Sequence, residues 1–411
     1  MKVYLVGGAV RDQLLCYPIK ERDWVVVGAT PEQLRQQGYQ QVGRDFPVFL
    51  HPSTREEYAL ARTERKSAPG YYGFDCDFNQ EVSLEEDLRR RDLTINAMAM
   101  DQEGQLIDPY NGQADLQAKL LRHVSPAFIE DPVRVLRLAR FAARYHHLGF
   151  KVADETRALM YAMVKRKELA YLVAERVWQE WQRSLEERNP EIFISTLRSC
   201  AALAIVLPEV DALFGVPNSN HYHPEVDSGV HTLMVLQAAV ELSTDPMIRF
   251  AALVHDLGKA ATPMGEWPKH HGHEERGVAL IEALCERLRI PADYRKFAVM
   301  ASRFHLNIHR LFELRAKTIV KILEQTDAFR RPQLFEKLLL VCEADAQGCG
   351  RKIDYKQASH WRYLLQECAK VSAQTLIEQG YQGEAIKAAL HQRRVACADL
   401  ILNSWKQHEK Q

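Results

Sequence analysis

Hydrophobic and polar residues follow different patterns in two parts of this chain, and the change falls near residue 130. Before it, short apolar runs of β-type residues predict strands at residues 3–6, 24–27, 46–50 and 57–61. A helix is predicted at residues 31–37, after Thr30. Beyond it, apolar residues recur at helical spacing at residues 133–145, 156–164, 174–186, 192–203, 229–242, 247–257 and 277–288. The pattern predicts an α+β protein, with an N-terminal α/β part followed by an all-helical body.

Prolines mark a joint within the helical body. Pro208, Pro217 and Pro224 interrupt the helical pattern and predict a loop-rich connection. We expect four regions, at residues 1–125, 126–215, 225–350 and 351–411. The last region is helical and polar, with helices predicted at residues 355–370, 374–379 and 383–406, and it carries no recognisable chemistry.

Composition narrows the class of protein. The 411 residues are 46% hydrophobic and 26% charged, which excludes a disordered chain, a collagen-like fibre and a small disulfide scaffold. Basic and acidic residues number 54 each, so any surface that binds a polyanion must be local. No apolar run is long enough to span a membrane, and the start of the chain has the pattern of a strand and turn rather than a signal peptide. The eight cysteines are scattered without a C-x-x-C pair, so we expect reduced thiols and a cytoplasmic protein.

Two short motifs near the N-terminus suggest phosphate and metal chemistry. Gly7 and Gly8 lie between a predicted strand and helix, where backbone N–H groups can approach an anion. The positively charged guanidinium of Arg11 can bind the same anion. Glu21 and Asp23 are two residues apart on the next strand, so both carboxylates point to one face and suit Mg²⁺. Taken singly, each motif is more often a structural turn or a solvated strand end.

The combination of these motifs resembles the DNA polymerase β-type nucleotidyltransferase head, a mixed sheet with helices. Three further motifs follow in order: RRDLTINAMA at residues 90–99, DPYNG at residues 108–112, and Glu130-Asp131 with Arg134. Together they resemble the class II tRNA nucleotidyltransferases, the CCA-adding enzymes of bacteria and eukaryotes, with related poly(A) polymerases. The resemblance covers about residues 1–210. One departure is Glu21, where the family usually carries Asp; the charge and the oxygen ligands are kept.

The resemblance implies roles for the head residues. Glu21 and Asp23 would hold the catalytic Mg²⁺, and Gly8, Arg11 and Arg91 would contact the triphosphate. A third carboxylate is left open between two candidates, which are Glu57 and Glu64.

The helix predicted at residues 133–145 begins at Asp131-Pro132, a typical N-cap followed by Pro. It carries a stripe of arginines at helical spacing, which are Arg134, Arg137, Arg140 and Arg144. A solvated basic face is the ordinary interpretation of such a stripe. After a nucleotidyltransferase head, contacts to the triphosphate and the base fit it better, and Arg137 and Arg140 would then clamp phosphates.

The resemblance assigns Asp131 and Arg134 to the edge of the incoming base. Cytosine and adenine both present an exocyclic NH₂ donor beside a ring-nitrogen acceptor, whereas guanine and uracil present a carbonyl beside a ring N–H. A fixed carboxylate beside a guanidinium therefore matches C and A and mismatches G and U. One pocket could thus accept CTP and ATP without an RNA template.

A second set of residues lies in the later helical region. His255-Asp256 ends an apolar helix, His231 precedes it, and His305 and Asp345 follow. This order resembles the HD superfamily of metal-dependent phosphohydrolases, and such a domain occurs in some gammaproteobacterial CCA-adding enzymes. Imidazole and carboxylate together suit a transition metal, which we expect to be Ni²⁺, or Co²⁺ or Mn²⁺. The ligands would be His231, His255, Asp256 and Asp345, with His255, Asp256 and His305 as catalytic residues. The alternative is that this region is a helical spacer whose histidines have no catalytic or metal-binding role.

These observations predict an enzyme that adds C, C and A to the 3′ end of tRNA, using CTP and ATP, in tRNA maturation and repair. The HD region would add a phosphatase, 2′-nucleotidase or 2′,3′-cyclic phosphodiesterase activity. A poly(A) polymerase shares the head motifs, and an RNA-binding protein with an inactive head is the alternative of another class. We expect tRNA as the macromolecular partner, no membrane contact, and a monomer or weak homodimer.

Overall fold

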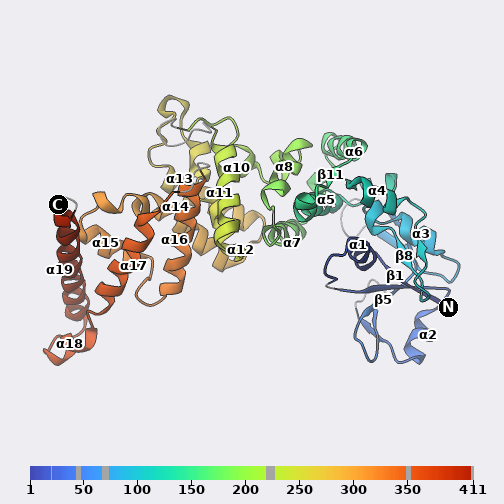
Figure 1. The fold of residues 1–411 in the computed structure, drawn as a ribbon, viewed down its shortest axis with the longest axis horizontal. Coiled ribbons are helices and arrows are strands. Elements are labelled where there is room, and N and C mark those ends of the chain that lie inside the picture. Colours follow the sequence, from blue (N-terminus) through green and yellow to red (C-terminus); the bar gives the residue numbers. More distant parts are fainter. Residues whose placement is uncertain (20, 43–47, 67–73, 219–226, 349–352, 409–411) are drawn as a thin grey trace. The chain divides into compact units, whose positions relative to one another are not determined.

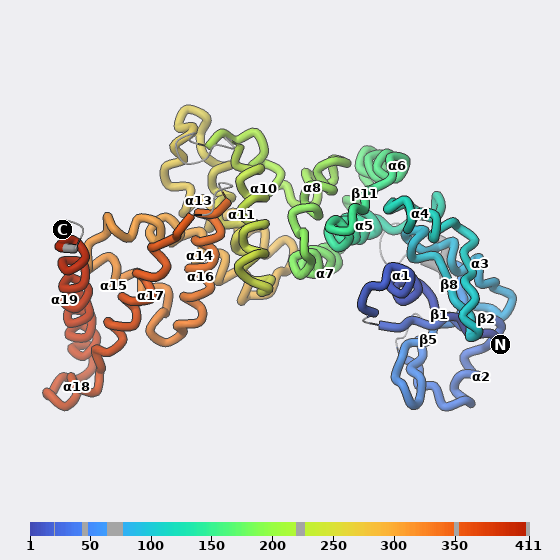
Figure 2. The backbone as a smooth tube through the Cα atoms, viewed as in Figure 1, coloured from blue at the N-terminus to red at the C-terminus, as the bar shows by residue number. Residues whose placement is uncertain are grey.

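The computed structural model describes residues 1–19, 21–42, 48–66, 74–218, 227–348 and 353–408. The chain divides into two compact units, Met1–Val206 and Leu207–Gln411, which are drawn in Figures 1 and 2. No helix within the described ranges is long and apolar enough to cross a membrane. The cysteines whose side chains are described are free thiols: Cys16, Cys200, Cys285, Cys342, Cys368 and Cys397.

A seven-stranded mixed sheet forms the N-terminal head, in the order β3-β4-β5-β2-β1-β8-β9. Its strands are β1 Lys2–Val6, β2 Asp23–Val27, β3 Gln40–Val42, β4 Val48–Leu50, β5 Glu57–Leu60, β8 Ala99–Met100 and β9 Leu106–Ile107. Strands β2 and β5 are parallel, and the other neighbours in this sheet are antiparallel. Two small sheets pair β6 Thr63–Lys66 with β7 Phe74–Asp77, and β10 Leu120–Leu121 with β11 Lys151–Val152. The predicted strands are confirmed, except that residues 46 and 47 lie outside the described residues.

The sheet buries both faces, and the alternation of β2 decides on which face Asp23 lies. Val26 packs with Leu34 of α2 (Pro31–Gln36) on one face, whereas Val25 packs with Leu88 of α3 (Leu84–Arg89) on the other. Because alternate residues of a strand face opposite sides, Asp23 lies on the face of Val25. That face also carries α3 and the Arg-rich segment that follows it.

Helices complete the first unit (Figure 1). They are α1 Gly8–Leu14, α2, α3, α4 Gly112–Ala118, α5 Val133–Tyr145, α6 Asp154–Lys165, α7 Ala174–Leu185, α8 Glu191–Ser199 and α9 Leu203–Val206. Helix α5 has the predicted bounds. The single helix predicted at residues 192–203 is wrong, because the chain turns at Ala201 (φ 60°). The N–H groups of Ala201 and Ala202 donate to the carbonyls of Arg198 and Leu197, which ends α8 before α9 begins.

The second unit is helical throughout its described residues. Its helices are α10 Pro208–Asp211, α11 Ser228–Leu242, α12 Pro246–Val254, α13 His273–Arg287, α14 Ala292–His309, α15 Ala316–Gln325, α16 Pro332–Gln347, α17 Lys356–Ala369, α18 Ala373–Glu378 and α19 Glu384–His408. Two predicted bounds need correction. The helix predicted to reach residue 257 ends at Val254, and a 3₁₀ helix follows at Leu257–Ala261. The helix predicted to begin at residue 277 begins earlier, at His273.

Candidate active sites

One cavity of about 700 Å³ in the first unit gathers nine of the head residues that the motifs indicated, whereas Glu57 lines another pocket with Glu21 and Asp23. Its lining includes Gly8, Arg11, Glu21, Asp23, Arg91, Asp131, Arg134, Arg137 and Arg140. The turn between β1 and α1 needs glycine at residue 7, since Gly7 has φ 68° and a Cβ there would lie 2.7 Å from the Arg91 guanidinium. Nine arginines and seven carboxylates line the cavity, so the local basicity expected of a polyanion-binding protein is present there.

Asp23 is the first residue of β2 and has a neighbour on β5, whereas Glu21 lies before the strand, so the prediction that both carboxylates lie on one strand is wrong. Asp23 pairs in register with Glu57 across the parallel strands, so both side chains lie on the same face of the sheet. The side chain of Glu64 lies outside the described residues. Desolvation raises the pKa of Asp23, Arg91 lowers it and Glu21 raises it, and the net shift is upward. Oxygen ligands whose negative charges repel one another fit a hard divalent cation such as Mg²⁺.

Arg11 is buried and held on several sides. Its Nε donates to Asp12 Oδ1 at 2.8 Å, and a terminal nitrogen donates to Asn96. The guanidinium lies 5.1 Å from the ring centroids of both Phe141 and Tyr145. Asp12 also accepts from the Tyr145 hydroxyl at 2.8 Å, and burial raises the pKa of that hydroxyl so that it stays a donor. Asp12 was not among the predicted residues, although it directly follows Arg11.

The arginine stripe of α5 is a set of ion pairs rather than a solvated face. Arg137 Nε donates to Asp92 Oδ2 at 2.8 Å, and Arg140 Nε donates to Glu180 Oε2 at 2.6 Å. Glu180, on α7, is 4% exposed, and its other oxygen lies 3.8 Å from Arg137. Burial raises the pKa of Asp92, but Arg137 and Asn96 outweigh it, so the carboxylate stays ionised. The sequence offered no sign of Glu180, which lies 40 residues after Arg140.

Asp131 and Arg134 both face the cavity, but each is held by another group. The predicted N-cap is wrong by one residue, because Pro132 is the N-cap of α5 and Asp131 precedes it; Asp131 Oδ1 still accepts from the N–H of Val133. Its two oxygens also accept from Arg176 on α7, at 3.2 and 2.8 Å. The Arg134 guanidinium donates to the carbonyls of Ala127 and Arg90, at 2.6 Å each. The carboxylate and the guanidinium are thus fixed independently, and Arg176 is a cavity residue that the sequence did not reveal.

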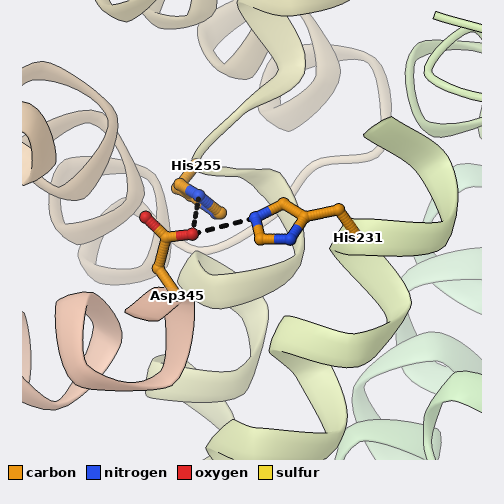
Figure 3. A group of neighbouring side chains, drawn as sticks. All are labelled: His231, His255 and Asp345. Atoms are coloured by element: carbon orange, nitrogen blue, oxygen red, sulfur yellow. Dashed lines mark hydrogen bonds and ion pairs between the residues drawn. The ribbon is translucent and has the colours of Figure 1, made fainter. Parts of the chain in front are cut away.

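The histidine and aspartate motifs of the second unit meet in a buried cluster, part of which is drawn in Figure 3. His231 comes from α11, Asp345 from α16, and His255 and Asp256 from the junction between α12 and the 3₁₀ helix. His231 Nε2 lies 2.9 Å from Asp345 Oδ1, and His255 Nε2 lies 3.5 Å from the same oxygen. The sequence therefore predicted residues that the fold does bring together.

The remaining members of the cluster surround Asp256. His305, from α14, lies 3.6 Å from Asp256 Oδ1, and Lys259 Nζ lies 2.6 Å from Oδ2. His273 Nε2 lies 3.0 Å from Oδ1. On the far side, His309 Nε2 lies 2.8 Å from Asp345 Oδ2. The HD order predicts no role for His273 or His309, because neither belongs to it.

The electrostatics of this cluster fit a divalent transition metal. Burial alone would lower the pKa of His255. The negative charges of Asp256 and Asp345 have the larger effect and raise this pKa to about 10. Burial lowers the pKa of His305 to about 3. His255 Nε2 is buried and has no hydrogen-bond partner among the described residues, although two carboxylates lie within 3.5 Å. A cation between the imidazole nitrogen and the carboxylate oxygens could be coordinated by both. Imidazole and carboxylate together suit Ni²⁺, Co²⁺ or Mn²⁺.

Three family models match separate segments of the chain. The Poly A polymerase head domain matches residues 3–122, and the HD domain matches residues 229–346. A third, described as "Probable RNA and SrmB- binding site of polymerase A", matches residues 149–214.

Curated relatives match over the full length. A protein of Legionella pneumophila (strain Paris) named Multifunctional CCA protein is 69% identical, over 100% of both chains. Proteins of the same name from Thioalkalivibrio sulfidiphilus and Vibrio cholerae (strain M66-2) are 60% and 55% identical, over 98% of this chain and 100% of theirs.

Solved structures show the same fold at lower identity. A CCA-adding enzyme in its apo form II superposes with a TM-score of 0.67 at 20% identity, covering 97% of this chain and 88% of that one. The Thermotoga maritima CCA-adding enzyme complexed with tRNA gives 0.62 at 19% identity, covering 97% and 87%. A CCA-adding enzyme with CTP gives 0.61 at 19% identity, covering 97% and 87%.

Proposed function

This chain belongs to the multifunctional CCA protein family, and on that premise we propose that it adds C, C and A to the 3′ end of tRNA, using CTP and ATP without a template. One observation carries the proposal: Glu21 and Asp23, the Gly-Gly turn and the arginines of α5 all line a single cavity. A single site that holds metal ligands, phosphate contacts and a base-reading pair has what nucleotide transfer requires.

The carboxylates of the head are proposed to hold Mg²⁺. Glu21 and Asp23 would be its ligands, with Glu57 as the third carboxylate because it pairs in register with Asp23. When bound, the metal would lower the pKa of the attacking 3′-hydroxyl and neutralise phosphate charge. Around it, the Gly7–Gly8 turn leaves room for phosphate oxygens, and Arg11 and Arg91 supply positive charge.

Asp131 and Arg134 are proposed to select the base. Arg176 and the backbone carbonyls of Ala127 and Arg90 hold their two side chains rigidly, so the edge they present is fixed before a nucleotide arrives. A fixed acceptor beside a fixed donor matches C and A and leaves G and U with unpaired polar groups. Arg137 and Arg140 also line the cavity and would contact phosphates.

The test is incubation of the protein with Mg²⁺, all four NTPs and a tRNA that ends at its discriminator base, followed by sequencing of the product ends. We expect CCA on the extended molecules. Tails of A alone would identify a poly(A) polymerase, and unchanged ends would favour an RNA-binding protein with an inactive head.

The buried cluster of the second unit is proposed to hydrolyse phosphoesters, including 2′,3′-cyclic phosphates, with a bound transition metal. His231, His255, Asp256 and Asp345 would be ligands, and His255, Asp256 and His305, which lie close together, would be the catalytic residues. A cyclic phosphate at a damaged tRNA end blocks the hydroxyl that the head must extend, so the two activities serve one substrate. A tRNA-directed enzyme of this kind would act in the cytoplasm as a monomer or weak homodimer.

A further inference from the structure

We propose that Cys368 and Cys397, in the C-terminal helical segment, form a reversible disulfide that fastens α19 to α17 when the protein is oxidised. The two cysteines lie on different helices, and neither nucleotide transfer nor phosphoester hydrolysis as proposed above uses them. Three observations support the pair: the packing of the two helices, the contacts of the two thiols, and the difference in their exposure.

The packing of α19 on α17 brings both cysteines to one interface (Figure 1). Cys368 lies in the last turn of α17 and is 0% exposed. On α19, Arg394, Cys397, Ala398 and Ile401 recur at spacings of three and four residues, so they share one face of the helix. Ala398 and Ile401 are buried, which identifies this face as the packed one.

The sulfur of Cys368 reaches this face of α19. Its Sγ donates to the carbonyl oxygen of Arg394 at 3.7 Å, one helical turn before Cys397. Burial raises the pKa of the Cys368 thiol to about 12, and the charge of Cys397 and a hydrogen bond with the Cys397 side chain add to this rise. Both residues are free thiols in this structure. Two thiols in hydrogen-bond contact across a helix interface are placed to become one disulfide.

The difference in exposure assigns each thiol its part in the reaction, with a peroxide as the oxidant. Cys397 is partly exposed, so its thiolate attacks a peroxide oxygen and the O–O bond breaks. Cys397 becomes a sulfenic acid, and the released hydroxide takes up a proton and leaves as water. The buried sulfur of Cys368 then attacks the Cys397 sulfur, and its proton passes to the departing hydroxyl, which leaves as a second water. A dithiol reductant restores both thiols by exchange.

The disulfide would act on the attachment of α19. Helix α17 is anchored in the second unit, because Nε1 of buried Trp361 donates to the carbonyl of Ile308 on α14 at 3.0 Å. Helix α19 contacts α15 through a partly exposed pair, in which His391 Nδ1 lies 3.0 Å from Glu324 Oε2. The new bond would close residues 369–396 into a loop and restrict the unfolded segment. Such bonds are transient in a reducing compartment, so the pair would respond to oxidation.

Peptide mapping tests the pair. The full-length protein is treated with hydrogen peroxide, its remaining thiols are blocked with a maleimide, and it is digested with trypsin without reductant for mass spectrometry. Trypsin cleaves after Lys and Arg, so the two cysteines fall on separate peptides, residues 363–370 and 395–406. We expect these peptides to be joined, and to separate in dithiothreitol. Cys397→Ser should lose the link, whereas Cys16→Ser, which removes an exposed cysteine of the head, should keep it.

Thermal unfolding tests what the link does. Oxidation should raise the unfolding midpoint of the second unit by several degrees in the wild type and in Cys16→Ser, and dithiothreitol should reverse the rise. Cys397→Ser should unfold at the same temperature before and after oxidation. Circular dichroism of the reduced variant identifies a loss of fold, and Cys397→Ala then provides the independent measurement.

Three results would overturn the proposal. The first is separate peptides from a protein whose exposed Cys16 has been oxidised, since the peroxide has then reacted without forming the pair. The second is a link from Cys397 to another cysteine or to a second chain, which a non-reducing gel shows as a doubled mass. The third is a joined pair without a rise in the midpoint, which would show that the bond does not fasten α19.

Discussion

The head cavity and the HD cluster hold their charges in opposite ways. In the cavity, long arginine side chains pair with carboxylates from other elements, as Arg140 does with Glu180 and Arg176 with Asp131. In the cluster, short imidazoles are buried, and the backbone carbonyls of Ala252 and Ser302 hold the rings of His255 and His305. The difference matches what each site is proposed to bind. An anionic nucleotide would meet arginines whose charges are balanced by carboxylates while the cavity is empty, whereas a metal ion would meet ligands oriented by the backbone.

The largest effect should come from the carboxylates of the head. Asp23→Ala should abolish CMP and AMP addition together, by more than about 10³-fold, because one metal site serves both nucleotides. Addition is measured with radiolabelled CTP and ATP on tRNA that ends before each position. HD activity should persist, since its residues lie in the other unit. Near-normal addition of either nucleotide would contradict the assignment.

Removal of the paired HD residues should produce the reverse pattern. We expect the double variant His255→Ala and Asp256→Ala to lose hydrolysis of phosphomonoesters and cyclic phosphates while CCA addition stays intact. Ni²⁺, Co²⁺ or Mn²⁺ should support the wild-type hydrolysis better than Mg²⁺, because neutral imidazole is a poor ligand for a hard ion. Hydrolysis that survives unchanged would mean that the cluster is structural.

Base selection should depend on the two residues fixed at the edge of the cavity. Arg134→Ala should reduce discrimination against UTP and GTP by about 1–3 kcal/mol, or roughly 5- to 150-fold, because one bidentate contact is lost. The measurement is kcat/KM for each of the four nucleotides. Arg137→Ala is the matched comparison, and it should raise KM for all nucleotides alike. Full preference for C and A in Arg134→Ala would exclude a templating role.

The smallest effect should come from removing the charge of Glu180, which pairs with Arg140 of the arginine stripe. Glu180→Gln keeps a hydrogen-bond acceptor but leaves buried Arg140 without its counter-charge, which should cost about 1–3 kcal/mol of unfolding free energy. It should also raise KM for both CTP and ATP several-fold. Asp154→Asn removes the partner of Arg157 in an exposed ion pair on α6 and should cost less than about 0.5 kcal/mol. Equal destabilisation of the two variants, measured by urea unfolding, would show that Glu180 does not hold the arginines.

Only part of each site could be predicted from the sequence. Contiguous motifs such as Gly7-Gly8 and His255-Asp256 predicted both sites, because the residues of each motif are adjacent in the chain. Glu180, Arg176 and His273 act across distances in the chain that only the packing of helices closes, so no local pattern marked them. The break at Ala201 was missed for a related reason: glycine usually marks a left-handed helix end, and here alanine takes that conformation.

The most direct test of the account uses one tRNA lacking CCA, prepared with either a free 3′-hydroxyl or a 2′,3′-cyclic phosphate. The wild type should open the cyclic phosphate with one water, release the remaining monoester as inorganic phosphate with a second, and extend both forms with CCA when Mg²⁺ and Ni²⁺ are supplied. The variant His255→Ala with Asp256→Ala should extend only the hydroxyl form, and Asp23→Ala should open the cyclic phosphate without extending either. Extension of the cyclic form by the HD variant, or addition of any nucleotide by Asp23→Ala, would contradict the claim that this chain repairs an end in one unit and builds it in the other.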